Sequence, residues 1–217
     1  MRNRVKGVRG IGTNDANYET QVYGLKDGKR ACLWVCPYYK TWSTLLKRVT
    51  TYKTKPQICE EWLIFSNFKS WMEKQHWEGM ELDKDILSSG HQIYSPGTCC
   101  FLPHNLNCIL KDNASYSKLH PLGVCSPKSL TGSKVFLMQV EKFTVRGGKR
   151  EKIAKRFKTA SEAHSAWQAE KSNQIESAVA WYARQSYFRT DVAEALTKRV
   201  WNLRLQGSCG EVTTRIN

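Results

Sequence analysis

No apolar run in the 217-residue sequence approaches the roughly 18 to 20 residues of a membrane span, and the start, MRNRVKGVRG, lacks the apolar stretch of a signal peptide. We therefore expect a soluble, cytoplasmic protein. We expect neither a membrane partner nor a nucleotide cofactor. Hydrophobic residues make up 41% of the chain and charged residues 24%, so a real core in one or two compact domains is expected rather than wholesale disorder.

Acidic residues are scarce, since 19 Asp and Glu stand against 34 Lys and Arg, which gives a formal net charge of +15. Before Ser115 the chain has 16 basic and 11 acidic residues, and from Ser115 onward it has 18 and 8. Residues 134–158 hold nine cations and two acids. Such a density of cations is suited to binding phosphates with release of counterions. Membrane binding more often uses a basic helix, whereas this segment has the pattern of a strand. The pattern therefore favours a nucleic acid.

The eight cysteines include no C-x2-C pair, the usual spacing of a zinc knuckle. A reducing cytosol keeps thiols free, so a disulfide framework is not expected. Structural Zn²⁺ stays open as an alternative to buried, reduced thiols. Its candidate ligands are Cys32, Cys36, Cys59 and Cys99.

Apolar spacing predicts two amphipathic helices in the first half, with aromatic stripes that belong to the core. Their apolar residues are Tyr39, Trp42, Leu45, Leu46 and Val49 in one, and Trp62, Phe65, Phe68 and Met72 in the other. Residues 1–31 show no periodicity, which predicts an irregular arm with at most a short hairpin around Lys26-Asp27-Gly28.

Residues 82–110 predict a strand at 82–87, a turn at 88–91, a strand at 93–102 and a short helix at 103–110. On a regular first strand, Asp83 and Asp85 would point to one face and Lys84 to the other. Asn107, or alternatively Asn105, lies at the start of the following short helix. Carboxylate and amide oxygens suit a single hard cation such as Mg²⁺.

Four ordered blocks carry a resemblance over roughly residues 32–110: CPYYKTW-x3-LKR, CEEWLIFSNFKSWM, WEG-x2-LDKDIL and YSPGTCCFLPHNLN. They resemble a phage-borne group of HNH-type homing endonucleases. The resemblance implies a ββα-metal nuclease module, with Asp83 as the metal carboxylate and Asn107 as the helix ligand.

Lys84 stands where the HNH pattern has its general-base His. A lysine with an ordinary pKa of about 10.4 is protonated at neutral pH and cannot take a proton from water. Three readings remain open. Lys84 stabilises charge on the phosphate while another base such as His91 acts, or metal-activated water cuts slowly, or catalysis is lost.

Residues 111–133 have the composition of a linker, and strands at 135–140 and 149–157 should follow, with a turn at Gly147-Gly148. A helix should open at Thr159 or Ser161. This part resembles the small DNA-binding domain of the Apetala-two/ethylene-response-factor type. The matching residues are Leu122, Gly123, Val124, Phe157, Thr159, Glu162, Ala163 and Trp167.

That second resemblance implies a three-stranded sheet that enters the major groove of double-stranded DNA, and a two- or three-stranded ribbon fits that groove. Trp167 is better explained as a core residue. Arg156 departs from the family, which commonly has Gly before the Phe. The expected DNA contacts are Lys142, Arg146, Lys149, Arg150, Lys152 and Arg156.

The expected fold class is α+β, with a small ββα-metal-like module followed by a three-stranded antiparallel sheet packed on a helix. The expected domains are an arm (1–31), the nuclease module (32–115), the DNA-binding domain (116–182) and a helical tail (183–217). The expected function is a site-specific, divalent-metal-dependent DNA endonuclease of the homing kind. The alternative is a phage DNA-binding protein with a degenerate nuclease module.

Overall fold

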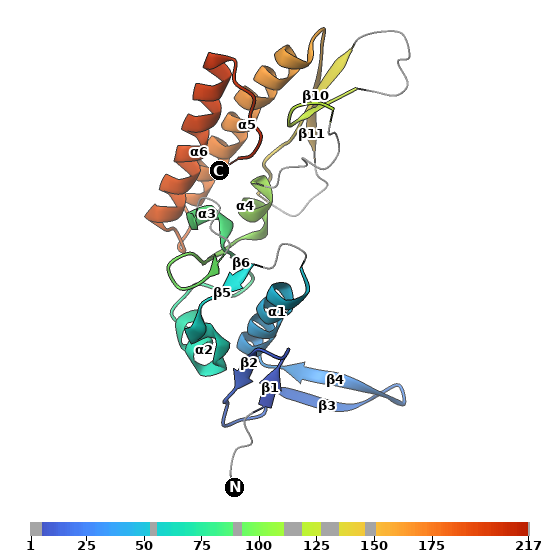
Figure 1. Ribbon diagram of the computed structural model, residues 1–217, viewed down its shortest axis with the longest axis vertical. Helices are drawn as coiled ribbons and strands as arrows, with labels where there is room; N and C mark the ends of the chain where they lie inside the picture. Colours follow the sequence, from blue (N-terminus) through green and yellow to red (C-terminus); the bar gives the residue numbers. More distant parts are fainter. Residues whose placement is uncertain are drawn as a thin grey trace. The chain divides into compact units, whose positions relative to one another are not determined.

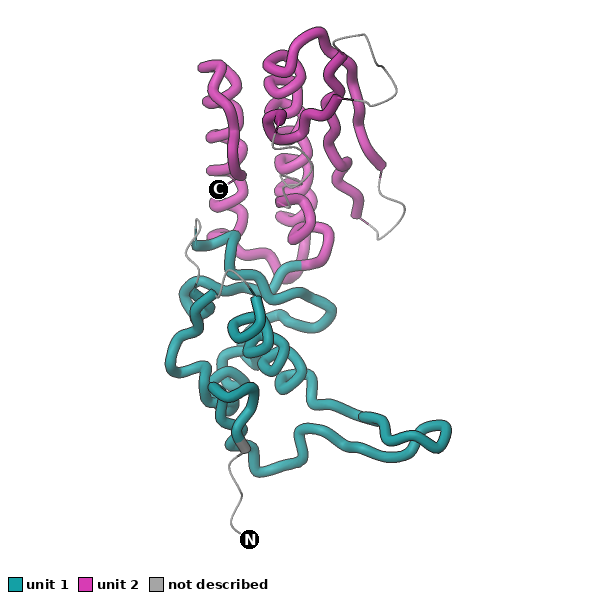
Figure 2. Tube along the Cα trace, turned by 45° about the vertical axis from the view of Figure 1, so that its right-hand side comes forward, with its two compact units in different colours: residues 1–102 teal, residues 103–217 magenta. Residues whose placement is uncertain are grey.

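The structure is a computed structural model, and it describes residues 6–52, 56–88, 93–110, 119–126, 135–145 and 151–216. The chain forms two compact units, residues 1–102 and residues 103–217 (Figure 2). The secondary structure is α+β, with small antiparallel sheets and helices, which agrees with the expected class. The predicted boundary between residues 115 and 116 lies outside the described residues.

The first unit contains the following elements (Figure 1): β1 (Lys6–Val8), β2 (Gly12–Asn14), β3 (Gln21–Lys26), β4 (Lys29–Val35), α1 (Pro37–Thr51), β5 (Gln57–Ile58), the 3₁₀ helix η1 (Glu60–Leu63), α2 (Phe65–Met72), β6 (Glu81–Asp83), α3 (Asp85–Ser88), β7 (Ile93–Tyr94) and β8 (Cys100–Leu102). The second unit contains α4 (His104–Ile109), β9 (Val124–Cys125), β10 (Phe136–Glu141), β11 (Lys152–Phe157), α5 (Ala160–Tyr182) and α6 (Thr190–Cys209). Within the described part of the chain, no helix is both long enough and apolar enough to cross a membrane.

Aromatic side chains of α1, η1 and α2 build the core of the first unit, as their spacing predicts. The rings of Trp42 and Phe65 lie 5.4 Å apart between centroids, and those of Trp62 and Phe68 lie 5.0 Å apart. The indole N–H of Trp42 donates to the backbone carbonyl of Trp62 at 2.6 Å, so the buried polar edge of the ring is satisfied. The first predicted amphipathic helix is confirmed as α1. The second is confirmed only from Phe65 onward, because Trp62 lies in η1 and the extended residue Ile64 separates η1 from α2.

Residues 6–35 are two antiparallel hairpins, β1–β2 and β3–β4, so the expectation of an irregular arm over 1–31 is wrong. Gly12 explains part of the order, because a Cβ there would overlap the side chains of Trp42 and Leu46, so the backbone packs directly on the core. The short hairpin expected at Lys26-Asp27-Gly28 is confirmed. Asp27 and Gly28 both have positive φ, which a two-residue turn with the right-handed twist of the strands requires.

Two strand predictions between residues 82 and 102 need correction. Asp83 ends β6, and its side chain accepts the backbone N–H groups of Asp85 and Ile86, which starts α3 within the predicted strand. A turn at 95–98 divides the predicted strand 93–102 into β7 and β8, and the Thr98 hydroxyl donates to the carbonyl of Ile93 at 2.7 Å. The helix expected from residue 103 is present as α4.

The second unit has the predicted three-stranded antiparallel sheet, in the order β11-β10-β9, and the predicted helix α5. Thr159 caps α5 by accepting the N–H of Glu162, while the Glu162 carboxylate accepts the N–H of Thr159. The expected helical character of the tail is confirmed by α6, which packs along α5 (Figure 1).

Candidate nucleic-acid interface and metal site

The sheet of the second unit has one face covered by α5. Met138 and Val140 of β10 are buried, and so are Ala163 and Trp167 of α5. The opposite face of β10 carries Leu137, Gln139 and Glu141, which alternate with Met138 and Val140 along the strand. Side chains point alternately to the two faces of a strand, and residues directly opposite each other on paired strands point to the same face. The register of β10 with β11 therefore tells which side chains of β11 share the outer face.

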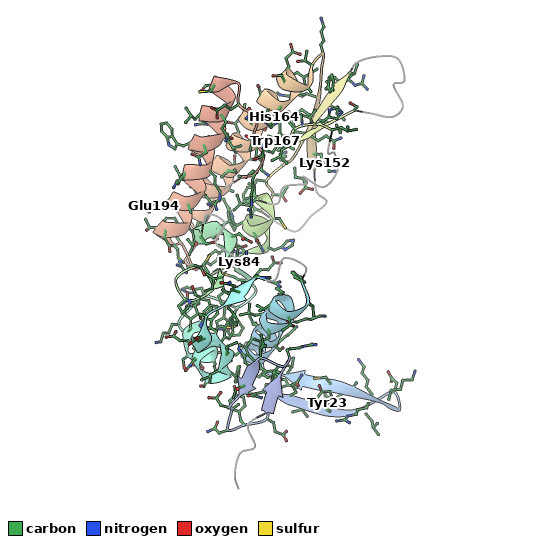
Figure 3. The ribbon with its side chains drawn as sticks, in the orientation of Figure 1. Tyr23, Lys84, Lys152, His164, Trp167 and Glu194 are labelled. Atoms are coloured by element: carbon green, nitrogen blue, oxygen red, sulfur yellow. The ribbon has the colours of Figure 1, made fainter. Side chains whose placement is uncertain are left out.

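Two predicted DNA contacts lie on this outer face. In the register of the strands, Arg156 is directly opposite Leu137, and Lys152 is directly opposite Glu141. Both cations are exposed, and Figure 3 shows Lys152 on the strand. Lys155 is opposite the buried Met138 and therefore belongs to the α5 side of the strand, although its side chain is exposed at the edge. Lys152 and Arg156 form the described part of a basic outer face.

Lys142 continues the strand pairing beyond β10, since its backbone N–H donates to the carbonyl of Glu151 at 2.9 Å. Its ammonium also pairs with the Glu151 carboxylate at 3.0 Å. Both side chains are more than half exposed, so the pair contributes little stability and can open when a phosphate approaches. Arg146, Lys149 and Arg150, also expected as DNA contacts, lie outside the described residues, as does the Gly147-Gly148 turn.

The buried junction between β9 and α5 fixes the sheet on its helix. Gly123 has a φ of +74°, and a Cβ at this position would overlap the Trp167 ring, which explains the Leu122-Gly123-Val124 segment in steric terms. Trp167 is 5% exposed, which confirms it as a core residue rather than a DNA contact. Figure 3 shows it beside His164 between helix and sheet.

Sequence reasoning missed His164, which is buried and links three segments of the second unit. Its Nδ1 lies 2.9 Å from the carbonyl of Leu122, and its Nε2 accepts the backbone N–H of Thr213 at 2.9 Å. Nδ1 therefore carries the proton and the ring is neutral. Burial lowers the pKa of His164, while the hydrogen bond to Leu122 opposes this shift.

Asp83 is the best-placed carboxylate of the predicted metal site. It ends β6, which pairs with β8 in antiparallel register so that Asp83 is opposite Cys100. Its Oδ1 accepts both capping N–H groups, at 2.9 and 2.8 Å, and within the described residues no hydrogen bond reaches Oδ2. Burial raises the pKa of Asp83, and the two N–H groups and the charge of Lys84 oppose that rise. A partly desolvated carboxylate whose second oxygen accepts no hydrogen bond from the described residues is suited to act as a ligand of a cation.

Asp85 does not share a strand face with Asp83, so that expectation is wrong. It is the first residue of α3, and its exposed carboxylate pairs with the Lys84 ammonium at 2.5 Å. The same ammonium lies 5.7 Å from the centroid of the Tyr94 ring. Lys84 is therefore held between the Asp85 carboxylate and the face of the Tyr94 ring, largely out of the solvent.

The predicted nuclease site has two further members, His91 and Asn107. His91 lies outside the described residues. Asn107 lies on α4 in the second unit and Asp83 in the first, and their pairing stays a prediction. No three His, Cys, Asp or Glu side chains gather into a metal site among the residues that the structure describes.

Two of the four candidate zinc ligands, Cys59 and Cys99, have surroundings that favour the thiol over the thiolate. Burial raises the pKa of Cys99 to about 12 and also raises that of Cys59. The Cys36 sulfur lies 3.5 Å from the hydroxyl of Tyr18, and Cys32 is exposed on β4. Zinc binds the deprotonated sulfur, so a zinc ion at Cys59 or Cys99 would have to offset this rise in the thiol pKa. The zinc hypothesis stays a prediction that this chemistry disfavours.

Comparisons with family models, with curated proteins and with solved structures find no match to this chain. Function must therefore be argued from the geometry and charge of these residues.

Proposed function

We propose that this chain is a site-specific DNA endonuclease of the homing type, which hydrolyses phosphodiester bonds of double-stranded DNA with a divalent metal ion such as Mg²⁺. The observation that carries the proposal is the Asp83 carboxylate. It closes an antiparallel strand pair, keeps Oδ2 available and is followed in sequence by the helix that bears Asn107. Strand β6, its antiparallel partner β8 and helix α4 follow one another in the order expected of a ββα-metal nuclease, with α3 and β7 between the two strands. A phage protein with this substrate acts in the cytoplasm of the host cell.

The sheet of the second unit supports the choice of DNA as substrate. Its outer face presents Lys152 and Arg156 on an exposed strand, while the other face packs against α5 in the core. The major groove of DNA admits a β-ribbon, and Arg can read guanine through two hydrogen bonds. Lys142, Arg146, Lys149 and Arg150 stay predicted DNA contacts, and alternation along the strand puts Lys142 on the same side as Met138 and Val140, at the exposed end of the strand pair.

At the proposed metal site, Asp83 would hold the ion through Oδ2, and Asn107 is the second ligand that the sequence resemblance implies. A bound Mg²⁺ would polarise the scissile phosphate and activate water. Lys84 is suited to stabilise negative charge on a phosphate oxygen, because its ammonium is already fixed by Asp85 and Tyr94. We therefore favour the reading in which Lys84 acts electrostatically and a different group, with His91 as the candidate, takes the proton.

The second candidate function is DNA binding without cleavage. The Lys84–Asp85 ion pair favours it, since it occupies the carboxylate that was expected as the second metal ligand of the strand. In this reading the first unit is a degenerate nuclease module, and only the basic surfaces remain functional.

The test is cleavage of genomic DNA from a relative that lacks the gene, in Mg²⁺ or Mn²⁺, with sequencing of the new ends. We expect discrete ends from the wild type and a loss of at least about 100-fold in cleavage rate for Asp83→Asn. Asparagine keeps the Oδ1 acceptor that caps α3, so folding should survive. A wild type that binds but leaves the DNA intact would support the second candidate instead.

Asp15→Asn is the matched control. Asp15 also accepts a backbone N–H, from Ser66 at 2.9 Å, and so has the same kind of structural bond outside the proposed site. Cleavage by Asp15→Asn should equal that of the wild type. Equal cleavage by Asp83→Asn would remove Asp83 from the mechanism.

A further inference from the structure

The β3–β4 hairpin is exposed on both faces. It extends away from the other elements of the first unit, and Tyr23 stands on it well clear of the core (Figures 1 and 3). Leu25 is 76% exposed, Tyr23 51% and Trp34 49%. A two-stranded ribbon alone is at best marginally stable in water, and large exposed apolar groups on a protein usually mark an interaction site.

The end of the hairpin is basic. Lys26 and Lys29 are directly opposite each other in the strand register, and Arg30 follows, with its guanidinium 5.2 Å from the centroid of the Tyr23 ring. Among the described ion pairs, none includes Lys26 or Lys29. Like charges directly opposite on adjacent strands destabilise the pair, and an anion between them removes that cost. Asp27 in the turn offsets only part of the charge.

Aromatic and aliphatic side chains alternate with these cations along the ribbon. Leu25 is opposite Arg30, and Tyr23 is opposite Cys32, so these four side chains share one face. Leu33 lies over Gly24 on the other face. Such a mixture suits DNA better than an apolar protein surface, because Lys and Arg bind phosphate while rings and methyl groups contact bases or the thymine methyl.

We propose that the β3–β4 hairpin is a second DNA-binding element, which enters the major groove of duplex DNA with Lys26, Lys29 and Arg30 on the phosphates. The choice of duplex DNA rests on the proposed function. The ribbon has the width that this groove admits, and its base is tied to the core by the N–H of Cys36, which donates to the carbonyl of Thr20 at 2.9 Å.

The test is binding of the full chain to a short, labelled, random-sequence duplex, by fluorescence anisotropy in EDTA over a range of salt concentrations. The variant Lys26→Ala/Lys29→Ala/Arg30→Ala should bind roughly tenfold or more weakly, and its log–log salt slope should be shallower by about 2.7. The matched control is Lys40→Ala/Lys47→Ala/Lys74→Ala, which removes the same charge from exposed positions outside the hairpin. Equal affinities of the two triple variants would overturn the proposal.

The same experiment separates this proposal from the proposed function, because EDTA makes binding independent of cleavage. If the wild type binds and the hairpin variant binds as the control does, the hairpin proposal fails and the endonuclease proposal stands. If the wild type does not bind duplex DNA, both fail.

The competing occupant is a second copy of the chain. Sedimentation of Leu25→Ser/Trp34→Ala distinguishes the two, since a dimer that becomes a monomer with unchanged DNA affinity would overturn the proposal. A DNA affinity that falls with no change in sedimentation would support it.

Discussion

The strand pairs β3–β4 and β10–β11 are both antiparallel and both carry cations, but only the second has a helix behind it. In β10–β11, which we call the backed sheet, one face is buried under α5, and the cations Lys152 and Arg156 lie on the other face. We call the β3–β4 hairpin the bare ribbon. In β3–β4 neither face is covered, and the register depends on the turn at Asp27-Gly28 and on cross-strand pairs. A buried face fixes the register of a strand pair strongly, whereas a bare ribbon depends on its turn or on a partner. We infer that the backed sheet is rigid before it meets DNA, while the bare ribbon gains stability there.

The largest expected effect is at Gly123, in the backed sheet. Gly123→Ala combines a positive φ with an overlap on Trp167 and should lower the free energy of unfolding of the second unit by roughly 3 to 5 kcal/mol. Urea denaturation measures it. Gly28→Ala, which has the same φ of +74° but no atom within 4 Å of the new Cβ, is the control in the bare ribbon and should cost about 1 to 2 kcal/mol of local strain. Equal losses for the two variants would show that packing behind the sheet contributes nothing.

The next effect is on DNA binding by the outer face of the backed sheet. Lys152→Ala/Arg156→Ala should weaken binding by about 1 to 3 kcal/mol per residue and make the salt slope shallower by about 1.8, because two phosphate or base contacts are lost. Lys155→Ala, on the same strand but on the α5 side, should have a smaller effect. Anisotropy titrations at several salt concentrations check both. A larger loss for Lys155→Ala would reverse the assignment of faces.

A third effect is pH dependence of stability in the second unit, from His164. The pKa of His164 is lowered in the folded chain, so between that value and about 6.5 the unfolded chain binds more protons. The stabilisation is complete above about pH 6.5 and is lost as the pH falls toward the folded pKa, at no more than about 1.4 kcal/mol per pH unit. Urea midpoints from pH 8 to pH 5 should show this loss, and His164→Gln should reduce it. His76→Gln, at an exposed position, should leave it unchanged.

The smallest effect on the free energy of unfolding is expected when an exposed apolar side chain of the bare ribbon is removed. Trp34→Ala should change the free energy of unfolding by no more than about 0.5 kcal/mol, since the ring is half exposed. Trp167→Ala should cost about 3 to 5 kcal/mol by the same measurement, because that ring is buried. A large loss for Trp34→Ala would mean that the ribbon is held by packing rather than by its ligand.

The helices were predictable because their signals are local. Aromatic spacing located α1 and α2, and the Thr159 to Glu162 capping pair located the start of α5. The pairing of β10 with β11 could also be predicted, since two apolar strands with a Gly-Gly turn between them precede that helix, whereas the third strand, β9, was expected only from the family resemblance.

The β1–β2 hairpin and the full length of the β3–β4 hairpin, beyond its turn, were missed for a physical reason. Their order comes from the contact of Gly12 with Trp42 and from a turn with positive φ at Asp27, neither of which produces a hydrophobic period. A ribbon exposed on both faces has no buried face and so leaves no alternating pattern in the sequence. The basic turn Lys26-Asp27-Gly28-Lys29-Arg30 was the available signal for its function.

In the candidate site, the strand position of Asp83 could be predicted from the sequence, but the position of Asp85 could not. Whether Lys84 and Asp85 continue a strand or turn into a helix depends on one side-chain acceptor, the Oδ1 of Asp83. His164 was also hidden, because its partners Leu122 and Thr213 lie 42 and 49 residues away.

The most direct test of two DNA-binding ribbons in one chain is a hydroxyl-radical footprint in EDTA on the DNA that flanks the gene. We predict two protected tracts for the wild type. The Lys26→Ala/Lys29→Ala/Arg30→Ala variant should lose one of them, and Lys152→Ala/Arg156→Ala should lose the other. No protection by the wild type, or two tracts that persist in both variants, would contradict the account.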